Sequence, residues 1–263
     1  MHITVNIYRR IPALKSHVYT ISERLLSQIV YTYYFQIPVS FLENELPWLR
    51  QFDTKLIANL CGSTIEDYVE VAEILGNKLD MFELNISCPN VKEGGMAFGT
   101  DAKMIEEITS KVKAVSKVPL IVKLSPNVTD IAEMAKAAEA GGADAISLIN
   151  TLLGMKIDIN TRRPVLNNNM GGMSGPAVMP VAVRMVYQVR QAVKLPIIGM
   201  GGITTGEDAV EFLLAGADAV SVGTAGIVDP YAWIKVRNGI NDYLDKNGYE
   251  SVNDIVGKLE MNN

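Results

Sequence analysis

Cysteine and histidine are scarce in this sequence. Its 263 residues include two cysteines, Cys61 and Cys88, and two histidines, His2 and His17. A chain of this length that depended on disulfides would carry more cysteines, so the count predicts a reducing, cytoplasmic location. The cysteines and histidines form no close group in the sequence, which argues against a structural zinc site, and we predict no metal.

The sequence also lacks an excess of basic residues and a clear membrane-spanning run. The formal net charge is −5, which argues against a nucleic-acid partner. Residues 25–42 carry no charge, but they include Gln28, Gln36 and Pro38. A spanning helix needs about 20 predominantly apolar residues, so we predict no membrane segment.

Glycine is missing from the first 61 residues, although the chain holds 21 glycines. The first 44 residues also contain five of the ten tyrosines, and four basic against two acidic side chains in an otherwise acidic chain. This change in character predicts an atypical N-terminal segment at residues 1–44 and a main domain at residues 45–263. The first segment is either an extension or β-rich cap, or a stretch that replaces the original start of the fold.

After residue 45, short apolar runs alternate with amphipathic stretches of helical period. The runs predict six strands, at Leu56–Cys61, Met81–Ile86, Leu120–Leu124, Ala145–Ile149, Pro196–Met200 and Ala219–Val222. The stretches between and after them predict six helices, at Thr64–Leu75, Asp101–Val115, Thr129–Ala140, Pro180–Val193, Gly206–Ala215 and Pro230–Asp245. Six successive units of this kind indicate a parallel sheet covered by helices.

The sheet could be an open doubly wound sheet or a (β/α)8 TIM barrel. Even spacing and polar or glycine residues at the end of every predicted strand favour the barrel, because a barrel gathers its site at that face. A complete barrel needs eight units, and residues 1–55 show no clear alternation of strand and helix. We therefore predict a (β/α)8 TIM barrel that is either complete or incomplete, with the first two βα units missing or replaced.

The last two predicted strands are each followed by glycines, Gly201-Gly202 and Gly223-Thr224. Backbone N–H groups exposed there could bind phosphate, as often happens after strands seven and eight of a barrel, or the glycines could merely allow tight turns. Lys123 lies inside an apolar strand, where it either points into the barrel mouth as a fixed positive charge or reaches solvent from an edge strand.

Cys88 follows a strand end and precedes a glycine-rich loop, so it is either an inert small residue or a thiolate base. Cys61 lies in an apolar run and is interpreted as structural. Four asparagines, Asn59, Asn85, Asn90 and Asn150, lie at or just past strand ends. One such amide often forms a turn, but four at one face indicate a flat ligand with many hydrogen bonds.

These residues, in this order, resemble the class 1 dihydroorotate dehydrogenases, FMN-dependent (β/α)8 barrels of pyrimidine synthesis. The resemblance extends from about Glu45 to Pro230 and is carried by seven motifs: Ile57-Ala58-Asn59, Glu83–Asn90, Val122–Asn127, Ile149-Asn150-Thr151, Gly172–Pro176, Gly199–Ile203 and Val222-Gly223-Thr224. Residues 90–99 and Thr151–Met155 are similar to the NAD-linked branch, class 1B. That branch pairs the FMN-bearing subunit, expected as a homodimer, with an electron-transfer subunit that carries FAD and a [2Fe–2S] cluster.

The resemblance implies a role for each matching residue. Cys88 would be the base that takes a proton from C5 of dihydroorotate, while a hydride leaves C6 for FMN. The pyrimidine would be held by Asn85, Asn90, Asn150 and Thr151. FMN would be held by Asn59, Asn85, Lys123, Ile149, Gly175, Gly201, Gly202, Gly223 and Thr224.

The first 44 residues depart from the family's pattern. They lack its Ala-Ser-Gly strand end, its Lys-Thr pair and its Asn-x-x-Gly-Leu-x-Asn loop. We therefore expect this chain alone to bind FMN weakly or not at all and to have little or no activity. Two alternatives stay open: another TIM-barrel enzyme with the same phosphate site, and a non-catalytic barrel remnant.

Overall fold

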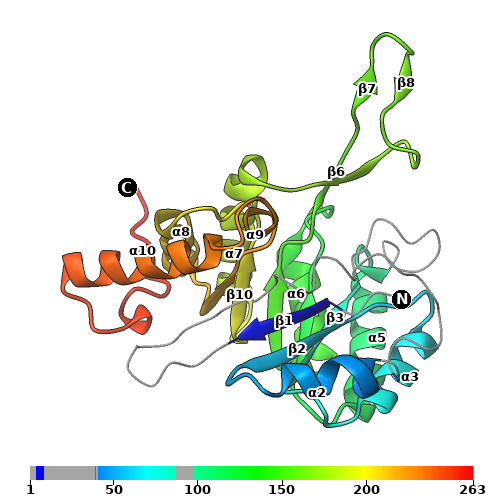
Figure 1. The fold of residues 1–263 in the computed structure, drawn as a ribbon. Helices are drawn as coiled ribbons and strands as arrows, with labels where there is room; N and C mark the ends of the chain where they lie inside the picture. Colours follow the sequence, from blue (N-terminus) through cyan, green and yellow to red (C-terminus); the bar gives the residue numbers. More distant parts are fainter. Residues whose placement is uncertain (1–3, 9–38, 40, 87–97, 263) are drawn as a thin grey trace.

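The computed structural model describes residues 4–8, 39, 41–86 and 98–262. Within these ranges all six predicted strands are confirmed, and no strand end differs from its predicted position by more than one residue (Figure 1). The strands are β2 (Lys55–Leu60), β3 (Met81–Asn85), β4 (Leu120–Lys123), β5 (Ala145–Leu148), β10 (Ile197–Met200) and β11 (Ala219–Ser221). They pair in parallel in this order.

The six predicted helices are also confirmed. They are α3 (Ile65–Leu75), α5 (Ala102–Val115), α6 (Ile131–Ala140), α7 (Met179–Ala192), α8 (Gly206–Ala215) and α10 (Ala232–Asn247). Asp101 and Asp130 cap α5 and α6, because each carboxylate accepts hydrogen bonds from two backbone N–H groups of the first turn. The shorter helical turns are η1 (Phe41–Glu45), α2 (Leu46–Leu49), η2 (Pro176–Val178), α9 (Thr224–Val228) and η3 (Val252–Asp254).

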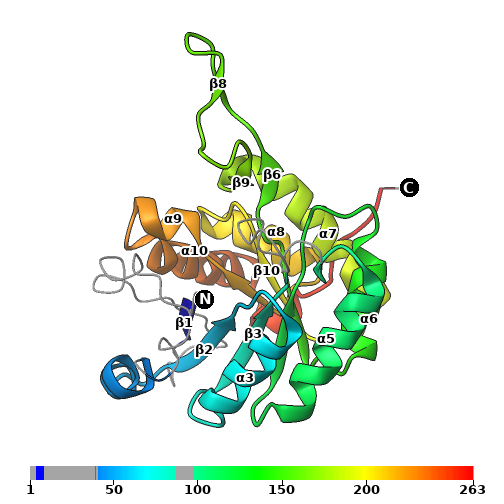
Figure 2. The ribbon, with the colours of Figure 1, turned by 90° about the vertical axis from the view of Figure 1, so that its right-hand side faces the viewer.

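The sheet of the described residues is curved and open, and it corresponds to part of a TIM barrel (Figure 2). A seventh strand, β1 (Thr4–Tyr8), pairs with β2 in the antiparallel direction, from Thr4 opposite Asn59 to Tyr8 opposite Lys55. In the described ranges β1 and β11 occupy the two edges of the sheet and are not paired with each other. The incomplete form of the predicted barrel is therefore the one observed, with an antiparallel strand at the place of an earlier parallel unit.

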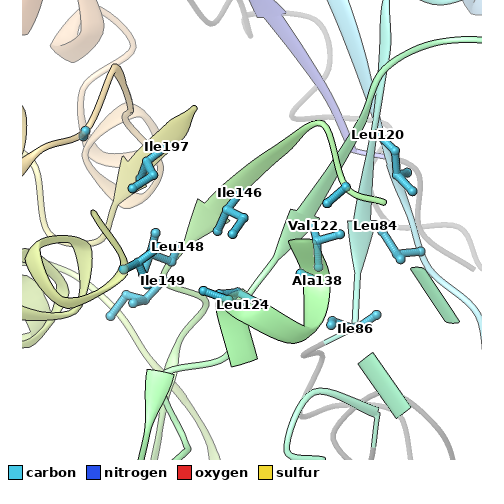
Figure 3. Packing of buried hydrophobic residues seen from close by; sticks show 14 of the residues in the cluster. Leu84, Ile86, Leu120, Val122, Leu124, Ala138, Ile146, Leu148, Ile149 and Ile197 are labelled. Carbon is cyan, nitrogen blue, oxygen red and sulfur yellow. The ribbon is translucent and has the colours of Figure 1, made fainter. Parts of the chain in front are cut away.

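Alternate residues of the central strands form the hydrophobic core between sheet and helices. Leu84, Val122 and Ile146 belong to neighbouring strands and are completely buried, and Figure 3 shows Val122 beside Ala138 of α6. Burying each such side chain stabilises the fold by roughly 1.5–3 kcal/mol. Because side chains alternate along a strand, Glu83 and Lys123 next to these residues must point to the opposite, concave face.

Three aspartates fix the amino-terminal edge of the sheet in the same way. Each one immediately precedes a strand and pairs with at least one basic side chain. Each also accepts a hydrogen bond from the backbone N–H of the first or second residue of the neighbouring strand. They are Asp80 with Leu56 and with Arg50 and Lys55, Asp144 with Leu120 and Lys113, and Asp218 with Ile197 and Arg190. Burial alone would raise the pKa of the Asp80 carboxyl, but its hydrogen bonds outweigh this effect and lower the pKa.

Residues 152–173 form an arm that projects from the body of the protein (Figures 1 and 2). It consists of two antiparallel pairs, β6 (Leu152–Gly154) with β9 (Gly171–Met173) and β7 (Ile157–Asp158) with β8 (Arg163–Pro164). Its exposed apolar side chains are Leu153, Met155, Ile157, Ile159, Val165, Leu166, Met170 and Met173. Within the described residues, no helix combines the length and apolar character that crossing a bilayer requires.

Candidate active site

A cavity of about 610 Å³ lies at the carboxyl ends of the parallel strands. Its volume falls in the range of about 300–1,000 Å³ that is typical of small-molecule sites. Every residue that the resemblance assigns to FMN lines it, together with two further residues assigned to the pyrimidine. These residues are Asn59, Asn85, Lys123, Ile149, Asn150, Thr151, Gly175, Gly201, Gly202, Gly223 and Thr224. Strands far apart in the sequence thus bring the predicted residues to one place.

At one end of the cavity, three asparagine amides form a hydrogen-bonded row. The Asn59 amide nitrogen donates to Glu83, and the Asn85 amide nitrogen donates to Asn59 Oδ1 over 3.1 Å. The Asn150 amide nitrogen donates to Asn85 Oδ1 over 3.2 Å, and Asn150 Oδ1 accepts the backbone N–H of Thr151 over 2.8 Å. The row crosses three strand ends, because Asn59 belongs to β2, Asn85 to β3 and Asn150 follows β5.

The row begins at the carboxylate of Glu83, which is 1% exposed. Its other oxygen accepts a hydrogen bond of 2.7 Å from the Ser147 hydroxyl of β5. The Lys123 ammonium of β4 lies 3.8 Å from the oxygen that Asn59 contacts. The position expected for Lys123 at the barrel mouth is therefore confirmed, and a buried carboxylate balances its charge.

The opposite end of the cavity is formed by glycines that follow β10 and β11. Gly202 has a φ of +87°, and a Cβ atom there would lie 2.8 Å from Met179 Cβ and 2.9 Å from the Gly175 carbonyl oxygen. Only glycine combines this backbone conformation with such a close approach. Gly223 faces open space, and the adjacent Thr224 hydroxyl donates to Ser174 Oγ over 2.9 Å. This end therefore offers main-chain groups and hydroxyls at the two glycine turns.

Two residues that hold the site together, Glu83 and Asn127, lie within the quoted motifs but were given no role from the sequence. Glu83 lies two positions before Asn85 in the same strand, and the alternation of side chains in β3 is the signal that could have found it. Asn127, after β4, donates from its amide to the Thr151 carbonyl over 3.0 Å and accepts the Leu153 N–H over 2.9 Å. It thereby ties Thr151 to the base of the arm.

Cys61 is buried, as its structural interpretation implies, but it also contacts the row. Its sulfur lies 3.5 Å from Asn59 Oδ1 and 3.4 Å from the Asn85 amide nitrogen. Cys88 and Asn90 lie outside the described residues. In the parts of the chain that the structure describes, no group of three or more His, Cys, Asp or Glu side chains could hold a metal ion.

The lining of the cavity changes from one end to the other. The end at Glu83 carries amides and the Lys123 ammonium, and the apolar Ile149 follows β5, which lies between β3 and β10 in the sheet. The far end carries the glycines, and the paired side chains of Asp229 and Lys235 also line the cavity. A flat ring with hydrogen-bonding edges fits the first part, and an anionic group fits the last. This donor set is therefore suited to a flavin mononucleotide.

Comparison with protein families gives a match to dihydroorotate dehydrogenase over residues 38–244. The matched region is wider at both ends than the stretch from Glu45 to Pro230 that carries the motifs. It includes β2, β3, β4, β5, β10 and β11, which surround the cavity.

Two curated relatives bear the name "Dihydroorotate dehydrogenase B (NAD(+)), catalytic subunit". The protein from Alkaliphilus oremlandii is 60% identical over 221 residues, which cover 84% of this chain and 73% of that protein. The protein from Lachnoclostridium phytofermentans is 62% identical over 218 residues, covering 82% and 73%. A solved structure, dihydroorotate dehydrogenase from Eimeria tenella in complex with ferulenol, aligns with a TM-score of 0.64 at 24% identity. It covers 75% of this chain and 58% of its own, and it supports the fold.

Proposed function

This chain belongs to the dihydroorotate dehydrogenase family. We therefore propose that its cavity binds FMN and that the protein oxidises dihydroorotate to orotate there. This reaction is a step of pyrimidine (UMP) synthesis, and NAD would be the final electron acceptor through a partner subunit. One observation carries the proposal: all residues that the resemblance assigns to FMN line a single cavity. They come from strands and loops spread over more than half of the chain.

The residues present fit FMN in the following way. Lys123 and the Asn59 and Asn85 amides would hold the isoalloxazine ring, and the glycines after β10 and β11 would hold the phosphate. FMN, when bound, supplies the acceptor for the hydride that leaves C6 of dihydroorotate. The ammonium of Lys123 would favour negative charge on the side of the cavity where it lies.

The chain itself would bind the substrate and remove one proton. Asn85, Asn90, Asn150 and Thr151 would hold the pyrimidine through amide and hydroxyl hydrogen bonds. The Cys88 thiolate would take the proton from C5 while the C5=C6 double bond of orotate forms. Asn85 is the last residue of β3 and lines the cavity. Cys88 comes three residues later in the sequence.

The proposal is tested with purified chain that is incubated with FMN, dihydroorotate and a dye that accepts electrons from reduced flavin. We expect little orotate formation, at a rate far below that of the Alkaliphilus oremlandii protein, because residues 1–44 lack the family motifs. Cys88→Ser should lower turnover by about 100-fold or more and leave the FMN dissociation constant unchanged, since general base catalysis contributes about 10²–10⁴-fold. Unchanged turnover in this variant would remove Cys88 as the base.

Two further functions would be favoured by other outcomes of the same experiment. A phosphosugar enzyme with a barrel of this kind would bind a sugar phosphate at the glycine end and give no flavin absorbance. A remnant without catalysis would bind neither ligand. The asparagine row and Lys123 favour the flavin, because a sugar phosphate has no flat ring to occupy that end.

The remaining parts of the proposal concern location, domains and partners. We propose a cytoplasmic protein with an atypical segment at residues 1–44 and an FMN-binding domain at residues 45–263. We also propose a homodimer that associates with an electron-transfer subunit carrying FAD and a [2Fe–2S] cluster. The exposed apolar side chains of the arm support an interface there, because large exposed apolar patches on soluble proteins commonly mark association sites.

The arm gives a direct test of the homodimer. Ile159 is 83% exposed at its tip, and Ile157 is exposed beside it. Replacing both with serine removes apolar surface without touching the cavity, so we expect a shift from dimer to monomer in light scattering and unchanged FMN affinity. Ile227→Ser, at a residue of the body that is 69% exposed and does not line the cavity, is the matched control. If the double variant still forms a dimer, the homodimer interface lies elsewhere. If it stays dimeric but no longer binds the electron-transfer subunit, the arm is the interface with that subunit.

A further inference from the structure

Glu83 stands at the start of a row of amides whose directions all agree. Each asparagine of the row, Asn59, Asn85 and Asn150, donates toward Glu83 and accepts from the side of Thr151. An asparagine side chain can be turned by 180° about its last torsion, which exchanges its donor and its acceptor. The common donor direction of all three asparagine side chains therefore requires a physical cause.

The two ends of the row supply that cause. An ionised carboxylate can only accept hydrogen bonds, so Glu83 forces Asn59 to present its amide nitrogen. The oxygen of Asn59 is then directed to Asn85, which must donate to it, and Asn85 in turn directs Asn150. At the far end the backbone N–H of Thr151 can only donate, which agrees with the same direction.

Residues of the two following strands in the sheet hold the Glu83 carboxylate in place. It belongs to β3, the Ser147 hydroxyl of β5 donates to one of its oxygens, and the Lys123 ammonium of β4 lies 3.8 Å from the other. Its side chain is almost completely buried, so water cannot replace these partners. An unpaired carboxylate at this depth would be strongly disfavoured, and the three partners account for its presence.

We propose that Glu83 is a positioning residue that sets the donor and acceptor directions of the whole asparagine row. Asn59 and Asn85 each use one N–H group and one oxygen lone pair within the row, and the Cys61 sulfur contacts both of these amides as well. All three amides line the cavity, so by fixing the row Glu83 sets the orientation in which these side chains border the ligand site. This inference rests on the proposed function for the identity of the ligand, but not for the direction of the row.

The test replaces Glu83 with glutamine, which keeps the shape and can both donate and accept. In ¹H–¹⁵N correlation spectra of the ligand-free protein, Glu83→Gln should shift the side-chain amide signals of Asn85 and Asn150, which do not contact Glu83. Ser147→Ala is the matched control, because it removes a partner of Glu83 and keeps the carboxylate. Asn247 donates to the Tyr243 carbonyl far from the row, and its signal should stay unchanged in both variants. Shifts confined to Asn59, or equal shifts in both variants, would overturn the proposal.

A second variant keeps the test decisive if Glu83→Gln does not fold. Asn150→Asp can still accept the Thr151 N–H but cannot donate to Asn85, so the Asn85 signal should shift while Asn59, anchored by Glu83, stays in place. An equal shift of Asn59 would show that Glu83 does not hold the row.

FMN titration of Glu83→Gln adds the ligand side of the test. We expect binding that is weaker by about tenfold, because hydrogen bonds to a charged group are the stronger kind. Ser147→Ala should change the affinity much less. If the unsubstituted chain binds no FMN, the flavin proposal fails, while the spectra still decide the role of Glu83.

Discussion

Lys123→Met is expected to weaken FMN binding by about 30-fold or more, which corresponds to the roughly 2 kcal/mol lower limit for truncating one partner of a buried charge pair. Methionine has a similar length but no charge, so the substitution leaves the carboxylate of Glu83 facing the cavity without its cation. The same carboxylate would then repel an electron-rich flavin ring. Fluorescence quenching of FMN during a titration measures the affinity.

The variant should also be less stable. Removing one partner of a buried ion pair costs about 3–5 kcal/mol when both groups are fully buried. The Lys123 side chain is 18% exposed, so we expect a smaller loss, of about 2 kcal/mol, in the free energy of unfolding. Lys113→Met is the control. Lys113 pairs with Asp144 at the amino-terminal ends of the strands, away from the cavity, and its side chain is more exposed than that of Lys123. Equal effects of the two substitutions on FMN affinity would show that Lys123 does not act through the cavity.

Gly202→Ala is expected to abolish measurable FMN binding. The new Cβ atom would come within 2.8 Å of Met179 Cβ, and the backbone has a φ of +87° that alanine adopts at a cost of about 1–2 kcal/mol. The loop after β10 must therefore shift, and its N–H groups leave the positions that would hold a phosphate. The measurement combines the FMN titration with urea unfolding.

A second glycine separates the two causes. Gly248 ends α10 with a φ of +72°, and nothing lies within 4 Å of the position of its Cβ atom. Gly248→Ala therefore carries a similar backbone cost without the clash and far from the cavity. We expect it to lose stability while its FMN affinity stays unchanged. A Gly202→Ala protein that binds FMN as well as the Gly248→Ala protein does would contradict a phosphate site at this loop.

The parallel strands and their helices could be predicted from the sequence, because their apolar runs and helical periods recur in each unit. The sheet brings together the ends of successive parallel strands, so the polar residues at those ends could be assigned to one face before their distances were known. Lys123 is the clearest case, since a charge inside an apolar strand has few other places to point.

Other features depend on contacts that the sequence pattern does not contain. Glu83 resembles an ordinary charged residue within a strand, and its role depends on Ser147, 64 residues away, and on Lys123. The antiparallel β1 was not predicted as a separate strand, although residues 3–8 alternate apolar and polar side chains. Its pairing depends on β2, which lies more than 40 residues later in the sequence. The arm was missed because its strands are only two or three residues long.

The most direct test of a flavin site at the strand ends is an FMN titration of the purified chain beside its Lys123→Met and Gly202→Ala variants. We predict saturable binding of one FMN per chain, weaker than binding by the Alkaliphilus oremlandii protein, and a large loss in both variants. Absence of saturable binding, or binding that neither substitution changes, would contradict the assignment of the cavity to FMN.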